Sequence, residues 1–456
     1  MTDERALLAR TSEIAAQYLE SLGTRPVRPD ADYATMLRAV DGPVPEQGTE
    51  PLAIVDELAL AAEPGLTAMG SGRYFGFVIG GALPASLAAD WLVSAWDQNA
   101  GLAQPTPALS ALEAVTGRWV LELLGLPAHA SFAFVTGCQM AHVTSLAAAR
   151  HAVYDRIGYD LRERGLAGAP PLRVVVGEHR HVTLIRALRL LGIGRAQEHV
   201  VPADSQGRMR VELLENVPTD GTPTIVCPLA GEVNTGAVDD LEGVIAAAHE
   251  RGAWVHVDGA FGLWAAASPR FAHLVHGHAA ADSWATDAHK WLNVPYDCGI
   301  AICAHPAMHA AAMEYAAPYL AVGGEAERDP MGYSPEFSRR ARSLPAWAAI
   351  RSLGRRGIAA MIEGSCDHAV AIADGLAALP GCEILNDVVL NQVLLRFETD
   401  GRTSEILAAV QREGEAWMGP TVWESRPAIR ISVSCWRTDD DDVRRTIAAF
   451  ARAATA

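Results

Sequence analysis

The sequence of 456 residues has no pattern of cysteines that would build a disulfide framework or a zinc site. Its cysteines number seven, an odd count, and no two of them form a C-x-x-C pair. Disulfide-rich folds and structural zinc sites use even or closely paired sets of cysteines. The sequence therefore predicts a protein without disulfides and without a bound metal ion.

The sequence also has no run of about 18 apolar residues, which is the length that crosses a membrane as a helix. Its first ten residues, MTDERALLAR, carry acids where a secretory signal would have basic residues followed by an apolar run. We therefore expect a cytoplasmic protein that has no membrane as a partner.

Basic residues are outnumbered by acidic ones: 37 Lys and Arg stand against 54 Asp and Glu, which gives a net charge of −17. Nucleic acids bind basic surfaces, so a nucleic-acid partner is not expected. Half of the residues are hydrophobic and 20% are charged, which is typical of folded domains and not of disordered chains. At about 100–200 residues per domain, the length predicts two or three folding units.

Short apolar runs alternate with helix-like segments between residues 130 and 305. We expect strands at 172–176, 224–227, 254–257, 283–286 and 299–303, with helices at 182–191 and 241–251 between them. This alternation is typical of βαβ units and predicts an α/β fold with a mainly parallel sheet. Ligands of such sheets bind beyond the carboxyl ends of the strands, and the candidate residues described below follow those ends.

The two ends of the chain differ from this middle part. Residues 5–22 carry apolar side chains on one face of a helix, which fits either an ordinary packed helix or an arm that contacts a second subunit. After residue 345, helical segments precede strands at 388–397 and 428–434, and a last helix follows the acidic segment TDDDD. We therefore divide the chain into an N-terminal helical arm (1–70), a large domain (71–340) and a small α+β domain (341–456).

A lysine, Lys290, lies in the segment DAHKW between two of the expected buried strands. Lysine prefers solvent, and burial would lower its pKa and make the amine a nucleophile suited to Schiff-base chemistry. Lys290 is therefore a candidate catalytic residue. Taken alone, a loop lysine that reaches solvent explains the pattern at least as well.

Three further candidates follow expected strands. Asp258 could pair with a pyridinium nitrogen, or it could simply cap the end of its strand. His181 could stack on a flat ring, or it could be a metal ligand or a core histidine. The turn 136–139 precedes an Ala-rich helix, whose first amides could bind a phosphate, or it could be a plain strand–helix turn.

In this order, the phosphate turn, the histidine, the aspartate and the lysine segment resemble the group II pyridoxal-phosphate (PLP) dependent amino-acid decarboxylases. That family includes the aromatic amino-acid, glutamate and diaminobutyrate decarboxylases. The resemblance covers roughly residues 70–455 and includes the segments TPALSALEAVTGRWVLELLGLP, GEVNTGAVDDLEGV, SRRARSLPAWAAIRSLGRRGI and IRISVSCWRTDDDDV. It implies fold type I of the PLP-dependent transferases, as in aspartate aminotransferase, with PLP bound by the large domain.

The resemblance implies a role for each matching residue. Lys290 would hold PLP as an aldimine, Asp258 would pair with the pyridine nitrogen, and Ala260 would pack against the ring. His181 would stack on the opposite face of the ring and take part in catalysis. The phosphate would be surrounded by Cys138, Gln139, Ser283, Asp287 and His289. The phosphate turn has fewer hydroxyl donors than is usual in the family, and Val233 stands where the family often has a threonine.

The resemblance also implies a mobile loop whose tyrosine donates a proton across a dimer interface. The corresponding stretch is AVGGEAERDPMGYSPEFSRR, in which Tyr333 is the only tyrosine. Tyr333 is therefore a candidate catalytic residue, or else a residue that packs the edge of the loop. The substrate pocket would draw on GRYFGFVIGGALP, especially Phe77 and Ile79, and the active protein would be a homodimer.

The main functional hypothesis is a PLP-dependent L-amino-acid decarboxylase that releases carbon dioxide and an amine through an external aldimine and a quinonoid. A PLP-dependent transaminase, aldolase or other lyase would use the same cofactor residues. These alternatives would be favoured if Arg430 faced the cofactor and bound the α-carboxylate of the substrate. A non-catalytic scaffold with this fold is a further alternative, which the presence of Lys290 disfavours.

Overall fold

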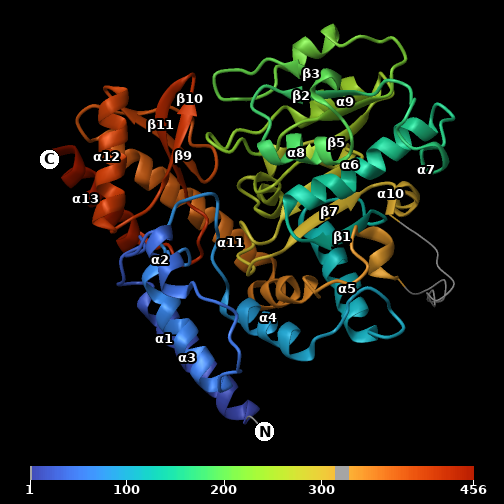
Figure 1. The fold of residues 1–456 in the computed structure, drawn as a ribbon. Coiled ribbons are helices and arrows are strands. Elements are labelled where there is room, and N and C mark those ends of the chain that lie inside the picture. Colours follow the sequence, from blue (N-terminus) through green and yellow to red (C-terminus); the bar gives the residue numbers. More distant parts are fainter. Residues whose placement is uncertain (1–2, 314–327, 456) are drawn as a thin grey trace.

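The computed structural model describes residues 3–313 and 328–455, which form three parts (Figure 1). The N-terminal helices, in blue, make an arm at the bottom of the view. A large α/β region lies at the right, and a smaller region built from the C-terminal residues, in red, lies at the left. The division at residues 70 and 340 that the sequence suggested stays a prediction.

The large region is built on a seven-stranded sheet with the order β1-β7-β6-β5-β4-β2-β3. Its strands are β1 (Ser131–Val135), β2 (Arg173–Gly177), β3 (Glu198–Val201), β4 (Thr224–Cys227), β5 (Trp254–Asp258), β6 (Ser283–Asp287) and β7 (Gly299–Cys303). β7 runs antiparallel to both of its neighbours, and the other pairs are parallel. The mainly parallel sheet is confirmed, and the expected strands match observed ones to within one residue at each end.

Helices surround this sheet. They are α4 (Pro84–Trp96), α5 (Pro107–Leu123), α6 (Cys138–Asp155), α7 (Leu161–Arg164), α8 (Val182–Leu190), α9 (Leu241–His249) and α10 (Pro306–Met313). α6 contacts β5, β6 and β7 on one side and α8 and α10 on the other, so it is buried nearly all round. Its many alanines let the helix approach the strands closely, and its first residue lies just beyond the carboxyl end of β1.

A long helix, α11 (Ser343–Ala377), joins the large region to the small one. Gly354 interrupts it with a left-handed φ of 61°. Residues of α11 up to Cys366 pack into the core of the large region, whereas Ala369 and the residues after it pack into the core of the small region. The helix therefore belongs to both regions, and the boundary predicted at residues 340–341 lies just before it.

The small region has a four-stranded antiparallel sheet with the order β10-β11-β9-β8. Its elements are β8 (Cys382–Ile384), β9 (Gln392–Phe397), α12 (Asp400–Glu413), β10 (Gly419–Trp423), β11 (Arg426–Ser432) and α13 (Asp440–Thr455). The strand expected at 388–397 begins only at Gln392. Residues 388–391 are not strand because the Val389 N–H bonds the Asp387 carbonyl in a tight turn.

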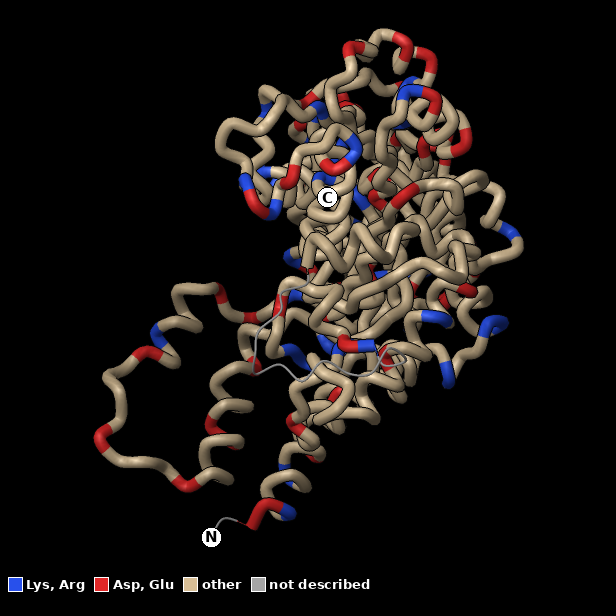
Figure 2. Tube along the Cα trace, turned by 90° about the vertical axis from the view of Figure 1, so that its right-hand side faces the viewer, with Lys and Arg blue, Asp and Glu red and all other residues tan. Residues whose placement is uncertain are grey.

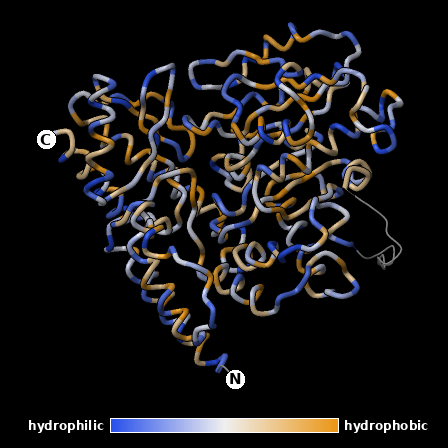
Figure 3. The backbone as a smooth tube through the Cα atoms, in the orientation of Figure 1, coloured by the Kyte–Doolittle hydropathy of each residue, from blue (hydrophilic) through white to orange (hydrophobic). Residues whose placement is uncertain are grey.

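The arm consists of α1 (Glu4–Ser21), α2 (Tyr33–Val40) and α3 (Pro51–Ala62), and none of these helices has a buried residue. α1 confirms the helix expected at 5–22. The arm stands away from the body and carries acidic residues (Figure 2), and apolar residues also lie along it (Figure 3). In the described part of the chain, no helix is long and apolar enough to cross a membrane.

Candidate active site

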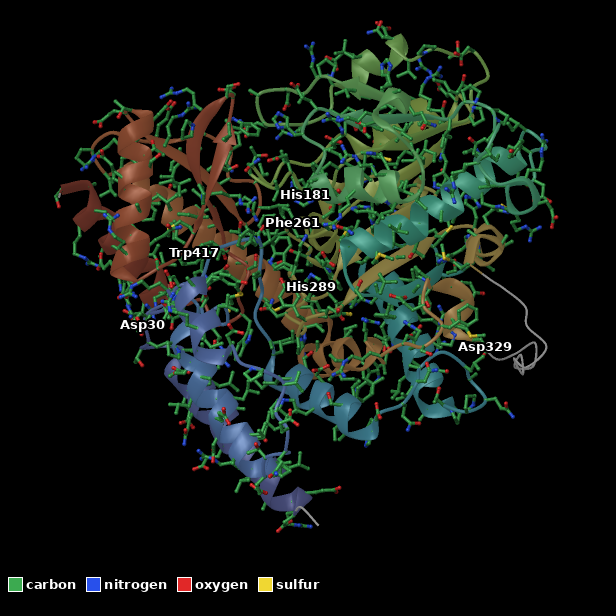
Figure 4. All side chains as sticks on the ribbon, in the orientation of Figure 1. Asp30, His181, Phe261, His289, Asp329 and Trp417 are labelled. Carbon is green, nitrogen blue, oxygen red and sulfur yellow. The ribbon has the colours of Figure 1, made fainter. Side chains whose placement is uncertain are left out.

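Side chains from loops at the carboxyl ends of the central strands meet in a cavity of about 330 Å³, together with one side chain from β11. Eight of the ten predicted site residues line this cavity: Cys138, Gln139, His181, Asp258, Ala260, Asp287, His289 and Lys290. Three of the lining residues, His181, Phe261 and His289, are labelled in Figure 4, where they lie between the large and small regions. A second cavity of about 380 Å³, beside β4 and α9, contains none of the predicted residues.

Lys290 is the only lysine in the whole sequence. Its side chain is 18% exposed, and its Nζ lies 3.2 Å from Asp287 Oδ2. Burial lowers the pKa of the Lys290 amine, but Asp287, Cys138 and Asp258 raise it, and the net pKa lies above its ordinary value. The prediction that burial would lower this pKa is therefore wrong, because the acidic neighbours outweigh desolvation.

Asp258 ends β5, and its side chain is almost completely buried. Its Oδ1 accepts the Ala260 N–H at 3.3 Å. Oδ2 has a long contact of 3.4 Å with His142 Nε2, which is not a hydrogen bond, and no hydrogen-bond donor among the described residues. A buried carboxylate oxygen without a donor is unfavourable. The position therefore fits a ligand that offers an N–H to Oδ2, as a protonated pyridine nitrogen does.

The charge of Asp258 also suits this role. Burial by itself raises the pKa of the Asp258 carboxyl, but His142, His181 and Lys290 together lower it below its ordinary value. Asp258 is therefore an anion at neutral pH. A buried anion of this kind stabilises a positive charge on a ring nitrogen that faces it.

The N-terminus of α6 points at the cavity from the opposite side. The Cys138 N–H donates to Asp287 Oδ1 at 2.6 Å, a contact that was not expected from the sequence. A Cβ on Gly137 would come within 3.3 Å of His289 Cε1, so the turn has little room for a side chain. A helix N-terminus favours a bound anion, and Asp287 would share this one with a phosphate.

The two predicted histidines of the cavity are neutral. His181 caps α8, where its Nδ1 accepts the Thr183 N–H at 3.3 Å and lies 2.7 Å from Thr183 Oγ1. His289 Nδ1 accepts the Cys298 N–H at 3.1 Å. Burial lowers the pKa of both imidazoles, so each offers a flat, uncharged ring.

Two predicted site residues lie elsewhere. Ser283 begins β6, whereas the cavity is at the other end of that strand, so a direct contact of Ser283 with a phosphate has no support in this geometry. Tyr333 ends a short 3-10 helix (Pro330–Tyr333), where its ring packs against His309 and the Arg328 guanidinium. It does not line the cavity of its own chain, and residues 321–327 of the predicted loop lie outside the described residues.

Several residues of the cavity were not predicted or were predicted only as alternatives. His179 stacks on Trp423 with 4.7 Å between ring centroids, and Phe261 closes another side. Phe77 lines the cavity as expected, with a left-handed φ of 56° that signals local strain. Ile79 instead packs in a separate apolar cluster with Val27.

Arg430 reaches the cavity from β11, in the small region. Burial lowers the pKa of its guanidinium, and Glu232 partly offsets this effect by raising it. A transaminase or an aldolase would gain support if Arg430 faced the cofactor and bound the α-carboxylate of the substrate. The first of these two conditions is met, because Arg430 lines the cavity.

Comparison with known proteins identifies the family. A family model described as "Pyridoxal-dependent decarboxylase conserved domain" matches residues 34–398. The chain belongs to this family. An aromatic-L-amino-acid decarboxylase of Bacillus atrophaeus is 25% identical over 469 residues, which cover 96% of this chain and 93% of that relative. A 4-hydroxyphenylacetaldehyde synthase of Rhodiola rosea is 26% identical over 430 residues, which cover 89% of this chain and 86% of that relative.

Solved structures agree on the fold. The crystal structure of Oryza sativa TDC with PLP and tryptamine superposes with a TM-score of 0.93 at 23% identity, covering 99% of this chain and 98% of that one. The predicted fold type I is therefore confirmed, as are the predicted family and the cofactor PLP. Within this family the protein is a PLP-dependent carboxy-lyase.

Proposed function

We propose that this decarboxylase removes the α-carboxylate of an L-amino acid as carbon dioxide and releases the amine. The observation that carries the proposal is that Lys290, Asp258 and His181 converge on one cavity. When bound, PLP supplies an electron sink for the pair of electrons that carbon dioxide leaves at Cα. The chain itself must anchor the cofactor, keep its ring charged and control the proton that replaces the carboxylate.

The three residues divide this work. Lys290 would attach the cofactor and, once the substrate amine has displaced it, hold a proton close to Cα, with Asp287 as its acidic neighbour at 3.2 Å. The Asp258 anion would keep the ring nitrogen protonated. The neutral His181 would cover the ring without adding a charge that competes with the sink. We propose that Cys138, Gln139, Asp287 and His289 surround the phosphate end.

The cavity walls support a substrate with an apolar or aromatic side chain. Phe77, Phe261, Leu229 and Val233 line the cavity, and aromatic walls favour flat, apolar groups. Arg430 is the exception among the lining residues, because an arginine that held the α-carboxylate would favour transamination or aldol cleavage over decarboxylation. Closing such a site excludes water from the carbon that is to be protonated.

A carbonyl-forming reaction is the second candidate, and a specific observation favours it. The phenol of Tyr333 lies beside His309, and no tyrosine of the described part of the chain lines the cavity. The Rhodiola rosea relative is named an aldehyde synthase. Unless the partner subunit brings Tyr333 to this cavity, an aldehyde product gains support, because the proton would then be added to the cofactor instead of Cα and the amino group would stay on the cofactor in its amine form.

A product balance separates these readings. The purified holoenzyme is incubated with a panel of L-amino acids labelled in the carboxyl group, and carbon dioxide, amine, aldehyde and keto acid are measured together, with Lys290→Ala as the control. We expect equal amounts of carbon dioxide and amine. Carbon dioxide with aldehyde would support the second candidate, and keto acid without carbon dioxide would support a transaminase. A protein that binds PLP but yields no product would support a scaffold.

We also propose that the active protein is a homodimer. The arm leaves large apolar side chains in solvent, among them Leu8 (65% exposed), Leu58 (65%) and Leu60 (80%). A set of this kind on helices without a buried residue is typical of a subunit interface. Light scattering should give about twice the 48.4 kDa of one chain, and an active monomer at assay concentration would overturn the proposal.

A further inference from the structure

Behind Asp258, four buried side chains form a line of close polar contacts that reaches away from the cavity. His142 Nε2 lies 3.4 Å from Asp258 Oδ2, and His142 Nδ1 lies 2.9 Å from His256 Nε2. His256 Nδ1 lies 3.0 Å from Ser283 Oγ, which also accepts the Trp254 indole N–H at 2.9 Å. The side chains come from α6, β5 and β6, and none of the four lines the cavity.

The two ends of this line fix the direction of its hydrogen bonds. The indole N–H of Trp254 can only donate, so Ser283 Oγ accepts there and its own proton is left for His256 Nδ1. His256 must then carry its proton on Nε2 and donate to His142 Nδ1. His142 in turn carries its proton on Nε2, the nitrogen that faces Asp258.

The reverse direction is unfavourable at both ends. It would set a bare His142 nitrogen against the Asp258 carboxylate and leave the Ser283 hydroxyl proton without an acceptor among the described contacts. Burial lowers the pKa of His256 well below its ordinary value, so this imidazole stays neutral and has a single N–H to place. Cys138 Sγ lies 3.5 Å from His142 Nε2 and can share the same proton as a weak acceptor.

We propose that Trp254, Ser283 and His256 are positioning residues that fix the tautomer of His142, so that its Nε2–H holds Asp258 in place as the acceptor for the ring nitrogen of PLP. The Nε2–H of His142, 3.4 Å from Oδ2, would stabilise the negative charge of the carboxylate and leave Oδ2 free to accept a hydrogen bond from the cofactor. This proposal requires that PLP binds at Asp258, and it does not depend on which product the reaction releases.

This assignment also accounts for a possible metal site. Cys138, His142 and Asp258 offer ligand atoms that lie within 4.8 Å of one another. A metal cation on Asp258 would repel a protonated pyridine nitrogen at the same carboxylate, so the cofactor of the family disfavours a metal ion here. The nearness of these three groups follows from the line of contacts behind Asp258.

Nuclear magnetic resonance of the holoenzyme tests the tautomers directly. With ¹⁵N-labelled histidine, two-bond couplings show which ring nitrogen carries the proton, and His142→Gln identifies the His142 signals by their loss. We expect both His142 and His256 to carry a proton on Nε2 and none on Nδ1. A proton on Nδ1 of His142 in the parent protein would overturn the proposal without recourse to any variant.

A remote substitution tests the effect on the cofactor. Trp254→Phe keeps a ring but removes the donor, so His256 and His142 should become mixtures of tautomers. With PLP labelled with ¹⁵N in its ring, the ring-nitrogen signal should shift toward the unprotonated value, and the dissociation constant of PLP should rise about tenfold, the size expected for one hydrogen bond to a charged group. Ser283→Ala should act alike, and Ser145→Ala is the control, since Ser145 is a buried serine of α6 that bonds Trp284 instead.

A double variant separates positioning from simple packing. His142→Gln places an amide N–H near the position of Nε2 and should keep most of the ring-nitrogen signal, whereas His142→Leu should lose it. In the His142→Gln background, Trp254→Phe should have no further effect on that signal, because the tautomer no longer matters. An unchanged signal in Trp254→Phe alone, or an equal further shift in the double variant, would contradict the proposal.

Discussion

Two fully buried histidines lie at opposite ends of the seven-stranded sheet and differ in what they face. His142, near the carboxyl end of β5, belongs to a line of polar groups that ends at the Asp258 carboxylate. His309, near the start of β1, has Ser131 Oγ at 2.9 Å and Arg328 nearby, and its Nε2 has no hydrogen-bond partner among the described residues. Burial and Arg328 lower the pKa of His309 to about 3. The histidine beside a carboxylate can therefore help to stabilise charge, whereas the histidine beside an arginine only packs.

The largest effect is expected at Lys290. Lys290→Ala should abolish covalent attachment of PLP, since the sequence contains no other lysine. The visible absorbance of bound PLP should disappear and product formation should fall to background. Lys290→Arg, which keeps a positive charge beside Asp287, is the matched control and should be equally inactive. Turnover in either variant would remove Lys290 from the mechanism.

Asp258→Asn should reduce turnover by about a hundredfold or more, because an amide cannot stabilise the protonated ring as an anion does. The dissociation constant of PLP should rise much less, since the Schiff base and the phosphate contacts remain. Steady-state kinetics at saturating PLP and a separate PLP titration measure the two effects. Asp282→Asn, a strand-start acid that faces His249 and His305, should leave turnover near that of the parent. Near-normal turnover in Asp258→Asn would contradict the cofactor role.

Tyr333→Phe changes the product if the partner subunit brings this residue to the cavity. The variant should then still release carbon dioxide but form aldehyde at the expense of amine, with slow inactivation. If Tyr333 only packs against His309, the product balance should equal that of the parent. Simultaneous measurement of amine and aldehyde decides, and unchanged amine would strike Tyr333 from the mechanism.

His309 should make the protein sensitive to acid. Its pKa in the folded state, about 3, lies below its unfolded value, so the unfolded chain binds the proton first and stability falls as pH drops below about 6.5. Between pH 7 and pH 5 this residue alone should cost about 2 kcal/mol of unfolding free energy. His309→Gln should remove that part of the loss in urea unfolding at the two pH values. His276→Gln, at an exposed histidine, should not, and equal acid sensitivity in all three proteins would contradict the assignment.

The sequence was sufficient for those parts of the site that are local along the chain. The strands around Lys290 and Asp258 and the helix that His181 caps follow from short apolar runs and their flanking residues. The antiparallel direction of β7 was not predicted, because an apolar run is the same in both directions. The contact between the Asp287 carboxylate and the first amide of α6 was also missed, because it joins residues 149 positions apart in the sequence.

The position of Ser283 shows the limit more sharply. It belongs to the same strand as Asp287, and closeness in sequence suggested closeness to the cofactor. A strand of five residues is nevertheless long enough to place its first and last residues at opposite ends of the sheet, and only the end at Asp287 faces the cavity. His142 gave no signal at all, because a histidine within an Ala-rich helix becomes meaningful only when β5 places Asp258 and His256 beside it.

The central claim, that PLP is held by Lys290 in the cavity that Asp258 faces, has one direct test. The holoenzyme is reduced with borohydride, digested, and searched by mass spectrometry for a phosphopyridoxyl group. The structure predicts one group per chain, on Lys290 in the peptide that contains DAHKW, and none in Lys290→Ala. Because the chain has no other lysine, a group found only on the N-terminal amine, or no group on a protein that retains PLP, would contradict the claim.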